Sequence, residues 1–471
     1  MNSVIRPLSF AFTLFASQLS FADTLADIYE LALKNDATLK TAEATYRANI
    51  ESENQAFSAL LPQINAYASH SESDIDSDGS SSFGGTVIPT SSTNRDAETD
   101  SWSISLNQNL FDLPVWFSFQ QGKELTKQAE AQLAFDQQDL IVRVAEAYFN
   151  VLRSIDNLEA AKAEERATKR QLEQTQQRFD VGLIAITDVH EARAVYDSTV
   201  VQRLTDEGNL GTSYESLMVL TGQPHANLWL LSKDFPVADP DPISRDEWVQ
   251  FALKNNNALK ASIFAMQAAQ ENASSKKMGH APTLTASIAY SDTDTEGDLE
   301  DLTTSTSNPF DSQSDGTTWS IDFKLPIFSG GRVSAQRRQA YEQYNAAMEN
   351  KIQTQRTVIR NARAQHITVV TDVQRVKARQ QAIVSTSSAL DATQAGYEVG
   401  TRNIVDVLQA QRALYSSIRD YANSRYDYVI NMLKLKRAAG TLTPQDIYAI
   451  NQWMVEPGAP TANQYQDYLN R

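Results

Sequence analysis

The sequence predicts an all-α protein with an added membrane β-structure. We expect a transmembrane β-barrel shared between several chains and continued by a long α-helical coiled-coil tube. Three observations predict this fold. The chain repeats itself once, each copy holds a very long run without glycine or proline, and each copy holds two alternating segments of strand length.

The amino terminus, residues 1–22, is typical of a secretory signal peptide. Arg6 supplies a positive start, residues 7–19 are mostly apolar, and Ser20-Phe21-Ala22 places small residues before a cleavage point at Asp23. A membrane anchor is the alternative, but the apolar stretch is short and interrupted by Ser and Gln. We therefore expect the mature chain outside the cytoplasm. No later stretch approaches the ~18 consecutive apolar residues of a membrane helix.

Composition excludes several classes of function. The net charge of −17 opposes binding to a nucleic-acid backbone, so no nucleic-acid partner is expected. Cysteine is absent, which excludes disulfides, thiol catalysis and thiolate metal sites. The five histidines show no ligand spacing, and no nucleotide-binding, zinc-protease or nucleophile-elbow motif is present. We predict neither an enzyme nor a cofactor.

Internal similarity divides the chain into two copies. FDVGLIAITDV at 179–189 is repeated as YEVGTRNIVDV at 397–407, so the starts differ by 218, and ALKN at 32 recurs at 252, a difference of 220. Accidental likeness of similar helices is the alternative, but the landmarks keep their order. The predicted organisation is a first repeat 23–230, a linker 231–242, a second repeat 243–443 and a carboxy-terminal segment 444–471.

Long helices form the core of each copy. Residues 123–181 and 332–395 contain no Gly or Pro, and the first run alone would span roughly 90 Å as a helix. A coiled-coil seam follows alternating spacings of three and four, through Ile141, Val144, Tyr148, Val151, Ile155 and Leu158. Gly182 and Gly400 end these helices and a helical pattern soon resumes. Each copy is therefore a helical hairpin, with tips at 181–188 and 399–406.

Two short alternating segments precede each long helix, at 63–71 and 101–110 and at 283–291 and 318–327. In the last of these, Trp319, Ile321 and Phe323 alternate with polar residues. A strand of a soluble sandwich is the alternative, but long polar loops at 72–100 and 292–317 are typical of the outside of a membrane barrel. Four strands cannot close a barrel. Two, three or four chains would give eight, twelve or sixteen strands.

The two polar loops carry acidic strings that resemble the start of a calcium loop. The residues are Asp74, Asp76 and Asp78 in the first copy and Asp292, Asp294 and Glu296 in the second. Neither string has the bidentate Glu that a calcium loop requires at its twelfth position. We predict no metal site here. Weak divalent-cation binding is the alternative to a solvated acidic loop.

The hairpin tips carry the charged residues of interest. Asp188 and Asp406 stand at equivalent places, near the start of the returning helix, where a carboxylate also interacts favourably with the helix dipole. Tyr397 and Arg402 have no polar counterpart in the first tip. This difference indicates that the two hairpins form different bonds where they meet.

These residues together make the chain similar to the TolC family of outer-membrane efflux proteins. The resemblance rests on the signal peptide, LLPQ near 60, the long helices, RFDVGLIAITDV and YEVGTRNIVDVL, and it covers nearly the whole mature chain. It implies a homotrimer with one twelve-stranded barrel in outer-membrane lipid, a periplasmic helical extension and a mixed equatorial region. It implies export of drugs, bile salts and toxins, and also of proteins. The implied partners are a periplasmic adaptor and an inner-membrane transporter, in tripartite pumps and type I secretion systems.

The resemblance also implies roles for residues of the tips. Asp188 would pair with Arg402, and Thr187 and Tyr397 would bond with Arg425, in a latch between the hairpins. Asp406 matches an aspartate ring at the constriction, while the family's second ring falls on Gln409, which is not acidic. The docking tips for the adaptor would be Gly182 and Leu183 in the first hairpin and Gly400 and Thr401 in the second. A periplasmic coiled-coil tether without a pore is the alternative function, but it leaves the strand pairs unexplained.

Overall fold

The computed structural model describes residues 23–459, so the predicted signal peptide and the last twelve residues of the carboxy-terminal segment lie outside it. The first copy consists of α1 (Leu25–Asn35), α2 (Ala37–Ser58), β1 (Gln63–Phe83), β2 (Thr86–Phe111), α3 (Leu113–Asp180) and α4 (Ile186–Thr221). The second consists of α5 (Arg245–Asn255), α6 (Asn257–Lys277), β4 (Thr283–Asp301), β5 (Thr306–Lys324), α7 (Arg332–Glu398) and α8 (Ile404–Ala439). The order of elements is the same in both copies.

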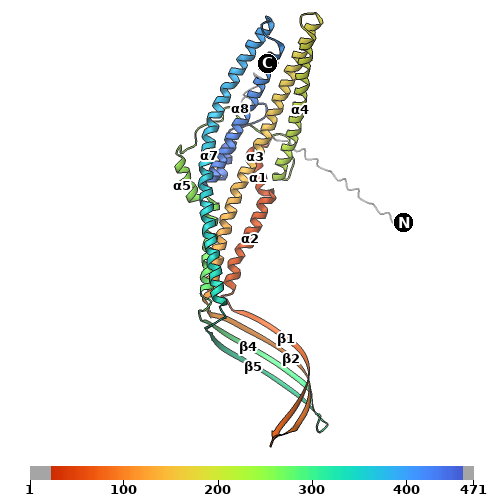
Figure 1. Ribbon diagram of the computed structural model, residues 1–471, viewed down its shortest axis with the longest axis vertical. Helices are drawn as coiled ribbons and strands as arrows, with labels where there is room; N and C mark the ends of the chain where they lie inside the picture. The colour runs from red at the N-terminus through yellow and green to blue at the C-terminus, as the bar shows by residue number, and fades with distance from the viewer. Residues whose placement is uncertain (1–22, 460–471) are drawn as a thin grey trace, which may run out of the picture. The chain divides into compact units, whose positions relative to one another are not determined.

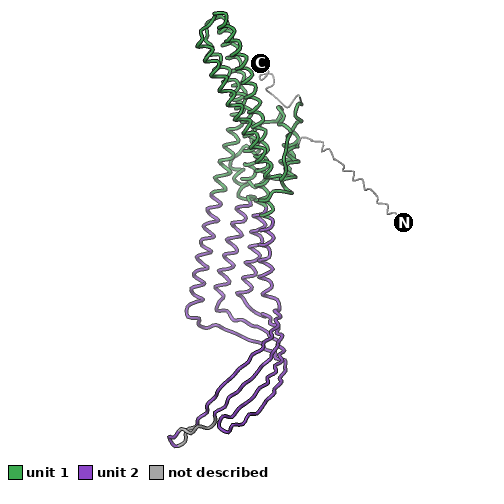
Figure 2. The backbone as a smooth tube through the Cα atoms, turned by 90° about the vertical axis from the view of Figure 1, so that its right-hand side faces the viewer, with its two compact units in different colours: residues 1–42, 134–256, 357–471 green, residues 43–133, 257–356 purple. Residues whose placement is uncertain are grey.

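The compact units of the structure do not coincide with the two sequence copies (Figure 2). Unit 1 contains residues 23–42, 134–256 and 357–459 of the described chain, and unit 2 contains 43–133 and 257–356. Each unit therefore takes matching segments from both copies. The predicted repeats 23–230 and 243–443 are repeats of sequence and element order, not separate domains, because the elements of one copy pack against those of the other.

The long helices of unit 1 pack along the predicted seam. Val144, Tyr148 and Val151 of α3 have no exposed surface, and Tyr148 and Phe149 form an edge-to-face ring pair that Tyr426 of α8 extends. The short helix α1 buries Leu25 and Ile28 in the same core. This burial confirms that the spacing of three and four marks a helix-packing face.

The helix α3 begins earlier than its glycine-free run predicts. It includes Pro114, which is tolerated in the first turn of a helix, and Gly122. A Cβ on Gly122 would lie 3.0 Å from Glu53 Cα of α2. Gly122 therefore serves close packing of α3 on α2 and does not break the helix.

The linker and the carboxy-terminal segment pack together in unit 1. The short strands β3 (Leu230–Leu231) and β6 (Met454–Val455) pair antiparallel, and α9 (Pro444–Asn451) precedes β6 and contacts α1. Phe235 of the linker lies edge-on to both Tyr428 and Trp453. Segments that are distant in sequence thus form one mixed region beside the long helices.

The strands of unit 2 form one antiparallel sheet in the order β1-β2-β4-β5 (Figure 1). They run far beyond the predicted segments, because most of the residues expected in the long loops 72–100 and 292–317 continue the strands. Only Gly84 and Gly85 separate β1 from β2. Both have positive φ, 64° and 85°, which a two-residue hairpin turn with the twist of the strands requires. The long-loop prediction is therefore wrong.

One face of this sheet changes character along the strands. Near the helices, paired positions are apolar, as in the row Ile64, Leu106, Ile288 and Trp319. Further out on the same face, the row Glu72, Glu98, Glu296 and Asp311 places like charges opposite one another, which is unfavourable for strand pairing. Within residues 23–459, no helix has both the length and the low polarity needed to span a bilayer.

A buried ion pair joins the start of α2 to α3 in unit 1. The Arg143 guanidinium donates to both carboxylate oxygens of Asp36, at 3.0 and 2.8 Å, and the Leu39 amide donates to the same carboxylate. Asp36 is 3% exposed. Burial raises the pKa of this carboxyl, but the bonds from Arg143 and from the backbone outweigh burial and hold the pKa below its usual value.

Replacing Arg143 by alanine should leave the buried Asp36 carboxylate without a counter-ion. Because Arg143 itself is partly exposed, we expect the free energy of unfolding to fall by about 2–3 kcal/mol, less than for a fully buried pair. Denaturant titration followed by circular dichroism measures this loss. The control Arg47→Ala removes the exposed 3.8 Å pair with Glu43 and should cost at most ~1 kcal/mol.

The same pair predicts a pH dependence. Since the folded-state pKa of Asp36 is lowered, its stabilising effect is present above the unfolded carboxyl pKa of ~3.9 and is lost as pH falls through the folded-state value. The stability difference between the wild type and Arg143→Ala should therefore shrink at acidic pH. A difference that stays constant down to pH ~2 would contradict this assignment.

Candidate functional site at the hairpin tips

The two hairpin tips are built by the same backbone motif. Gly182 and Gly400 have φ values of 77° and 80°. The Gly182 amide donates to the Phe179 carbonyl and the Leu183 amide to the Arg178 carbonyl, and the second tip repeats both bonds through Gly400 and Thr401. This is the Schellman ending of a helix, in which the residue with positive φ is usually glycine. These turns lie within the ranges 181–188 and 399–406 expected for the tips.

The returning helices begin differently. Asn403 caps α8: its side chain accepts from the Asp406 amide at 2.8 Å, while the Asp406 carboxylate accepts from the Asn403 amide. The residue that precedes α4 in the capping position is Ala185, whose side chain cannot make such a bond. Asp406 therefore has a structural role at the helix start, in addition to its charge, and Asp188 lacks the capping partner.

Within one chain, Arg402 lies beside Asp406 and not beside Asp188, its predicted latch partner. Its guanidinium is 3.8 Å from the Asp406 carboxylate, and it remains largely exposed. Asp188 instead accepts a long hydrogen bond, 3.4 Å, from Thr187. In the described chain, the structure does not bring Asp188 and Arg402 together. Gln409 is exposed on α8, one turn after Asp406.

Tyr397, which has no polar counterpart in the first tip, contacts the first hairpin through Arg178 and not through the expected Arg425. The Arg178 guanidinium of α3 lies over the Tyr397 ring of α7, 4.8 Å from its centroid, which is a cation–π contact. The ring also packs against Ile404 and Leu408 at the start of α8. The Tyr397 hydroxyl oxygen is buried, and no hydrogen bond to it is formed by any residue of 23–459.

The structure does not place Arg425 at the tip. Arg425 is buried on α8, 21 residues after Ile404 in one continuous helix, so it lies about 30 Å along the axis from the helix start. Its guanidinium donates to the Ser232 carbonyl in the linker. The expected bonds to Thr187 and Tyr397 are not formed in the chain, because the rigid helix holds Arg425 beside the linker.

Ion pairs between α3 and α8 connect the hairpins at a place that our sequence reasoning missed. Arg437, Lys434 and Asp427 of α8 pair with Asp139, Glu146 and Arg153 of α3, the last two at 2.5 Å. The three α3 residues recur every seven positions, as charges flanking a coiled-coil seam do. That heptad spacing is the sequence signal that could have predicted these contacts.

A cleft of ≈ 380 Å³ lies between α3, α7 and α8, about one and a half to four turns from the tip glycines. Two of its glutamines are buried, Gln171 and Gln411. The side-chain nitrogen of Gln171 and the side-chain oxygen of Gln411 have no hydrogen-bond partner among the described residues. An unpaired buried donor and acceptor favour a polar group in this cleft.

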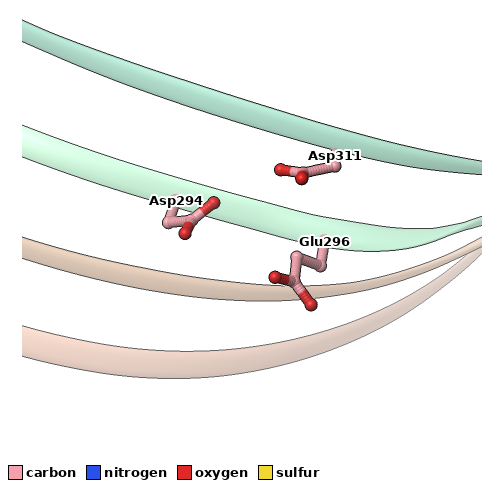
Figure 3. Close-up of side chains that lie close together, drawn as sticks. All are labelled: Asp294, Glu296 and Asp311. Atoms are coloured by element: carbon pink, nitrogen blue, oxygen red, sulfur yellow. The ribbon is translucent and has the colours of Figure 1, made fainter.

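The acidic strings of the sheet lie on strands and not on loops. Asp294, Glu296 and Asp311 place one carboxylate oxygen each within 4.8 Å of the others (Figure 3). In β1, Asp74 and Asp76 both accept from the Asn94 side chain, and Asp78 accepts from Ser92. A flat strand cannot wrap around an ion as a calcium loop does, so the resemblance to a calcium loop does not extend to the structure.

The fold and the two hairpin tips define an outer-membrane channel protein. The sequence pattern of the family described as "Outer membrane efflux protein" matches residues 28–223 and 248–441. The two matches begin 220 residues apart, in agreement with the internal repeat. The chain belongs to this family, whose members are channels and not enzymes. It is an outer-membrane exit duct for efflux and secretion, with a periplasmic helical extension.

Individual relatives cover almost the entire chain. Outer membrane protein TolC of Vibrio cholerae is 35% identical over 92% of this chain and 94% of its own length, and that of Escherichia coli is 36% identical over 94% and 87%. Among solved structures, that of CusC superposes with a TM-score of 0.73 at 18% identity, covering 93% of this chain and 99% of its own. The last comparison shows the fold alone.

Proposed function

We propose that three copies of this chain form one channel that exports small molecules such as drugs, bile salts and toxins, and also proteins. The observation that carries the oligomer is the sheet of unit 2, in which β1 and β5 each pair on one side only. Backbone groups at a sheet edge in lipid must find partners. Pairing β1 of one chain with β5 of the next removes every edge and, in a trimer, gives twelve strands.

Asp406 is the proposed constriction residue. Asp406 follows Gly400 as Asp188 follows Gly182, and it matches the aspartate ring of the family, which supports this role. Three symmetric carboxylates would attract multivalent cations. The proposed gate has a single acidic ring, because Gln409 offers only a neutral amide at the next turn. The capping bond from Asn403 fixes the Asp406 carboxylate at the helix start.

Replacing Asp406 by asparagine should nearly abolish block by trivalent cations added from the periplasmic side. Asparagine keeps an oxygen that accepts from the Asn403 amide, so the helix start is preserved while the charge is lost. Gln409→Asp should strengthen the block by adding a second ring. Current through the reconstituted trimer, recorded as the cation is titrated, measures both effects. If trivalent cations block the Asp406→Asn channel as strongly as the wild type, Asp406 does not form the proposed ring.

The proposed latch joins Asp188 of one hairpin to Arg402 of a hairpin in a neighbouring chain. Both groups are at the tips and neither forms a short ion pair within its own chain. Thr187 is exposed at the same tip and is a further proposed latch residue, whereas the buried Tyr397 hydroxyl must turn outward to join the latch. Arg425 is left out of the latch because it bonds with the linker.

Removing the latch charges should raise single-channel conductance. Each exposed pair contributes at most ~1 kcal/mol, but three symmetric copies act together on one entrance. The double variant Asp188→Asn with Arg402→Gln is compared with Glu43→Gln with Arg47→Gln, which removes an exposed pair on α2. Recordings in planar bilayers should show larger conductance only for the first variant. Equal conductance in both would remove the latch from the proposal.

The tips are the proposed docking surface for a periplasmic adaptor, which in turn engages an inner-membrane transporter. Val181, Leu183 and Val399 flank the tip glycines and are each at least 70% exposed. Apolar side chains gathered on an otherwise polar end favour a protein partner.

Changing Leu183 to aspartate should abolish export in cells, measured as drug resistance in a strain without its own channel. A charge cannot enter an apolar contact without a large cost, while the exposed position leaves folding unaffected. The bulky substitution Gly182→Leu should also abolish export, but because φ is 77° at this position it strains the tip backbone as well, so Leu183→Asp is the cleaner test. Val219→Asp, equally exposed on α4, is the control. Survival of resistance, or loss of trimers, would argue against docking at the tip.

A further inference from the structure

A basic cleft in unit 2 has no role in the channel function described above. It measures ≈ 650 Å³ and lies between α6 and α7, where Lys277, Arg337 and Arg338 surround it together with Tyr341, Glu342 and Tyr344. Lys276 and Arg332 add two more exposed cations at the same ends of the two helices. The three cations that line the cleft contrast with the net charge of −17 of the chain.

These cations are not neutralised within the described chain. None of the five side chains forms a hydrogen bond or ion pair with any residue of 23–459. The acid in the cleft, Glu342, accepts a 3.1 Å bond from Asn345. By contrast, Arg143, Arg153 and Lys434 of unit 1 are all paired with carboxylates. Unpaired cations around a cleft favour an anionic ligand.

The cleft stands beside the apolar band of the sheet. The α6 helix ends at Lys277 just before β4, and α7 begins at Arg332 just after β5. Between β5 and α7, Ile327 and Phe328 are over 80% exposed. From Arg332 to Arg338 a helix rises about 9 Å, close to the ~5–8 Å depth of one headgroup layer. A phosphate held by these cations would therefore lie within about one headgroup layer of the apolar band.

The aromatic rings fit the same location. Tyr341 and Tyr344 lie with ring centroids 6.4 Å apart, and Tyr341 is 56% exposed. Tyrosine is favoured at membrane interfaces, because the ring is apolar and the hydroxyl is polar. The corresponding end of the first copy, where α3 begins, has only Lys123 and Lys127, and Lys127 is paired with Glu124. The basic cleft is therefore specific to the second copy.

We propose that this cleft binds the phosphate headgroup of an anionic phospholipid in the periplasmic leaflet of the outer membrane. Lys277, Arg337 and Arg338 contact the phosphate. Tyr341 and Tyr344, which lie further along α7 from the sheet, pack against the polar headgroup beyond the phosphate, and the acyl chains run toward Ile327 and Phe328. The lipid would fix the level at which the helices leave the membrane. The proposal rests on the outer-membrane location and is independent of the gate, the latch and the adaptor.

The test compares the association of spin-labelled phosphatidylglycerol and phosphatidylcholine with the full-length channel in bilayers. We expect the channel to favour phosphatidylglycerol, with about a fivefold loss of preference for each cation removed. The variant Lys277→Gln with Arg337→Gln and Arg338→Gln should show no preference. The control Lys40→Gln with Lys254→Gln and Lys260→Gln removes three exposed cations elsewhere and should keep it.

Three outcomes would overturn the proposal. The first is a wild-type channel that does not distinguish the two lipids, and the second is equal loss of preference in the control variant. The third is loss of the preference on adding inorganic phosphate at constant ionic strength, which would assign the cleft to free phosphate. Single-channel conductance of each variant is recorded alongside. Failure of lipid binding with normal conductance would leave the proposed channel intact.

Discussion

The need to pair every backbone group of the sheet is the constraint on which the rest of the architecture depends. One chain supplies four strands, and the outer two, β1 and β5, each lack a neighbour on one side. In lipid such an edge is too costly to persist. A single copy cannot complete its own membrane structure. Symmetric association of several chains follows from this requirement.

The duplicated sequence supplies the strands and helices of this architecture from two copies of one pattern. Each copy supplies two strands and one helical hairpin, and the elements of the two copies are combined in both compact units. A seam of apolar residues holds α3 in the core of unit 1, and ion pairs at heptad spacing join α3 to α8. The buried Asp36 and Arg143 pair fixes the start of α2 against α3 in the same unit.

The two copies differ at the positions for which roles are proposed. Both tips end in the same glycine motif, but only the second has Asn403 to cap its returning helix and Arg402 and Tyr397 beside it. Only the second copy also has the basic cleft at the start of its long helix. Identical repeats would form a ring of equivalent hairpins. Divergence at these positions lets one hairpin carry charges that the other does not.

The sequence by itself determined the repeat, the hairpins with their tips at Gly182 and Gly400, the position of the strand pairs and the family. These features have local causes, namely periodicity and the preference of glycine for positive φ. Tertiary structure decided three others: the length of the strands, the inclusion of Gly122 within α3, and the place of Arg425. The strands extend because antiparallel pairing with neighbouring strands stabilises polar segments whose local sequence predicts loops. Gly122 is needed within α3 because the backbone of α2 packs too close for a larger residue. Arg425 bonds with the Ser232 carbonyl, 193 residues away in sequence, a contact that no local pattern contains.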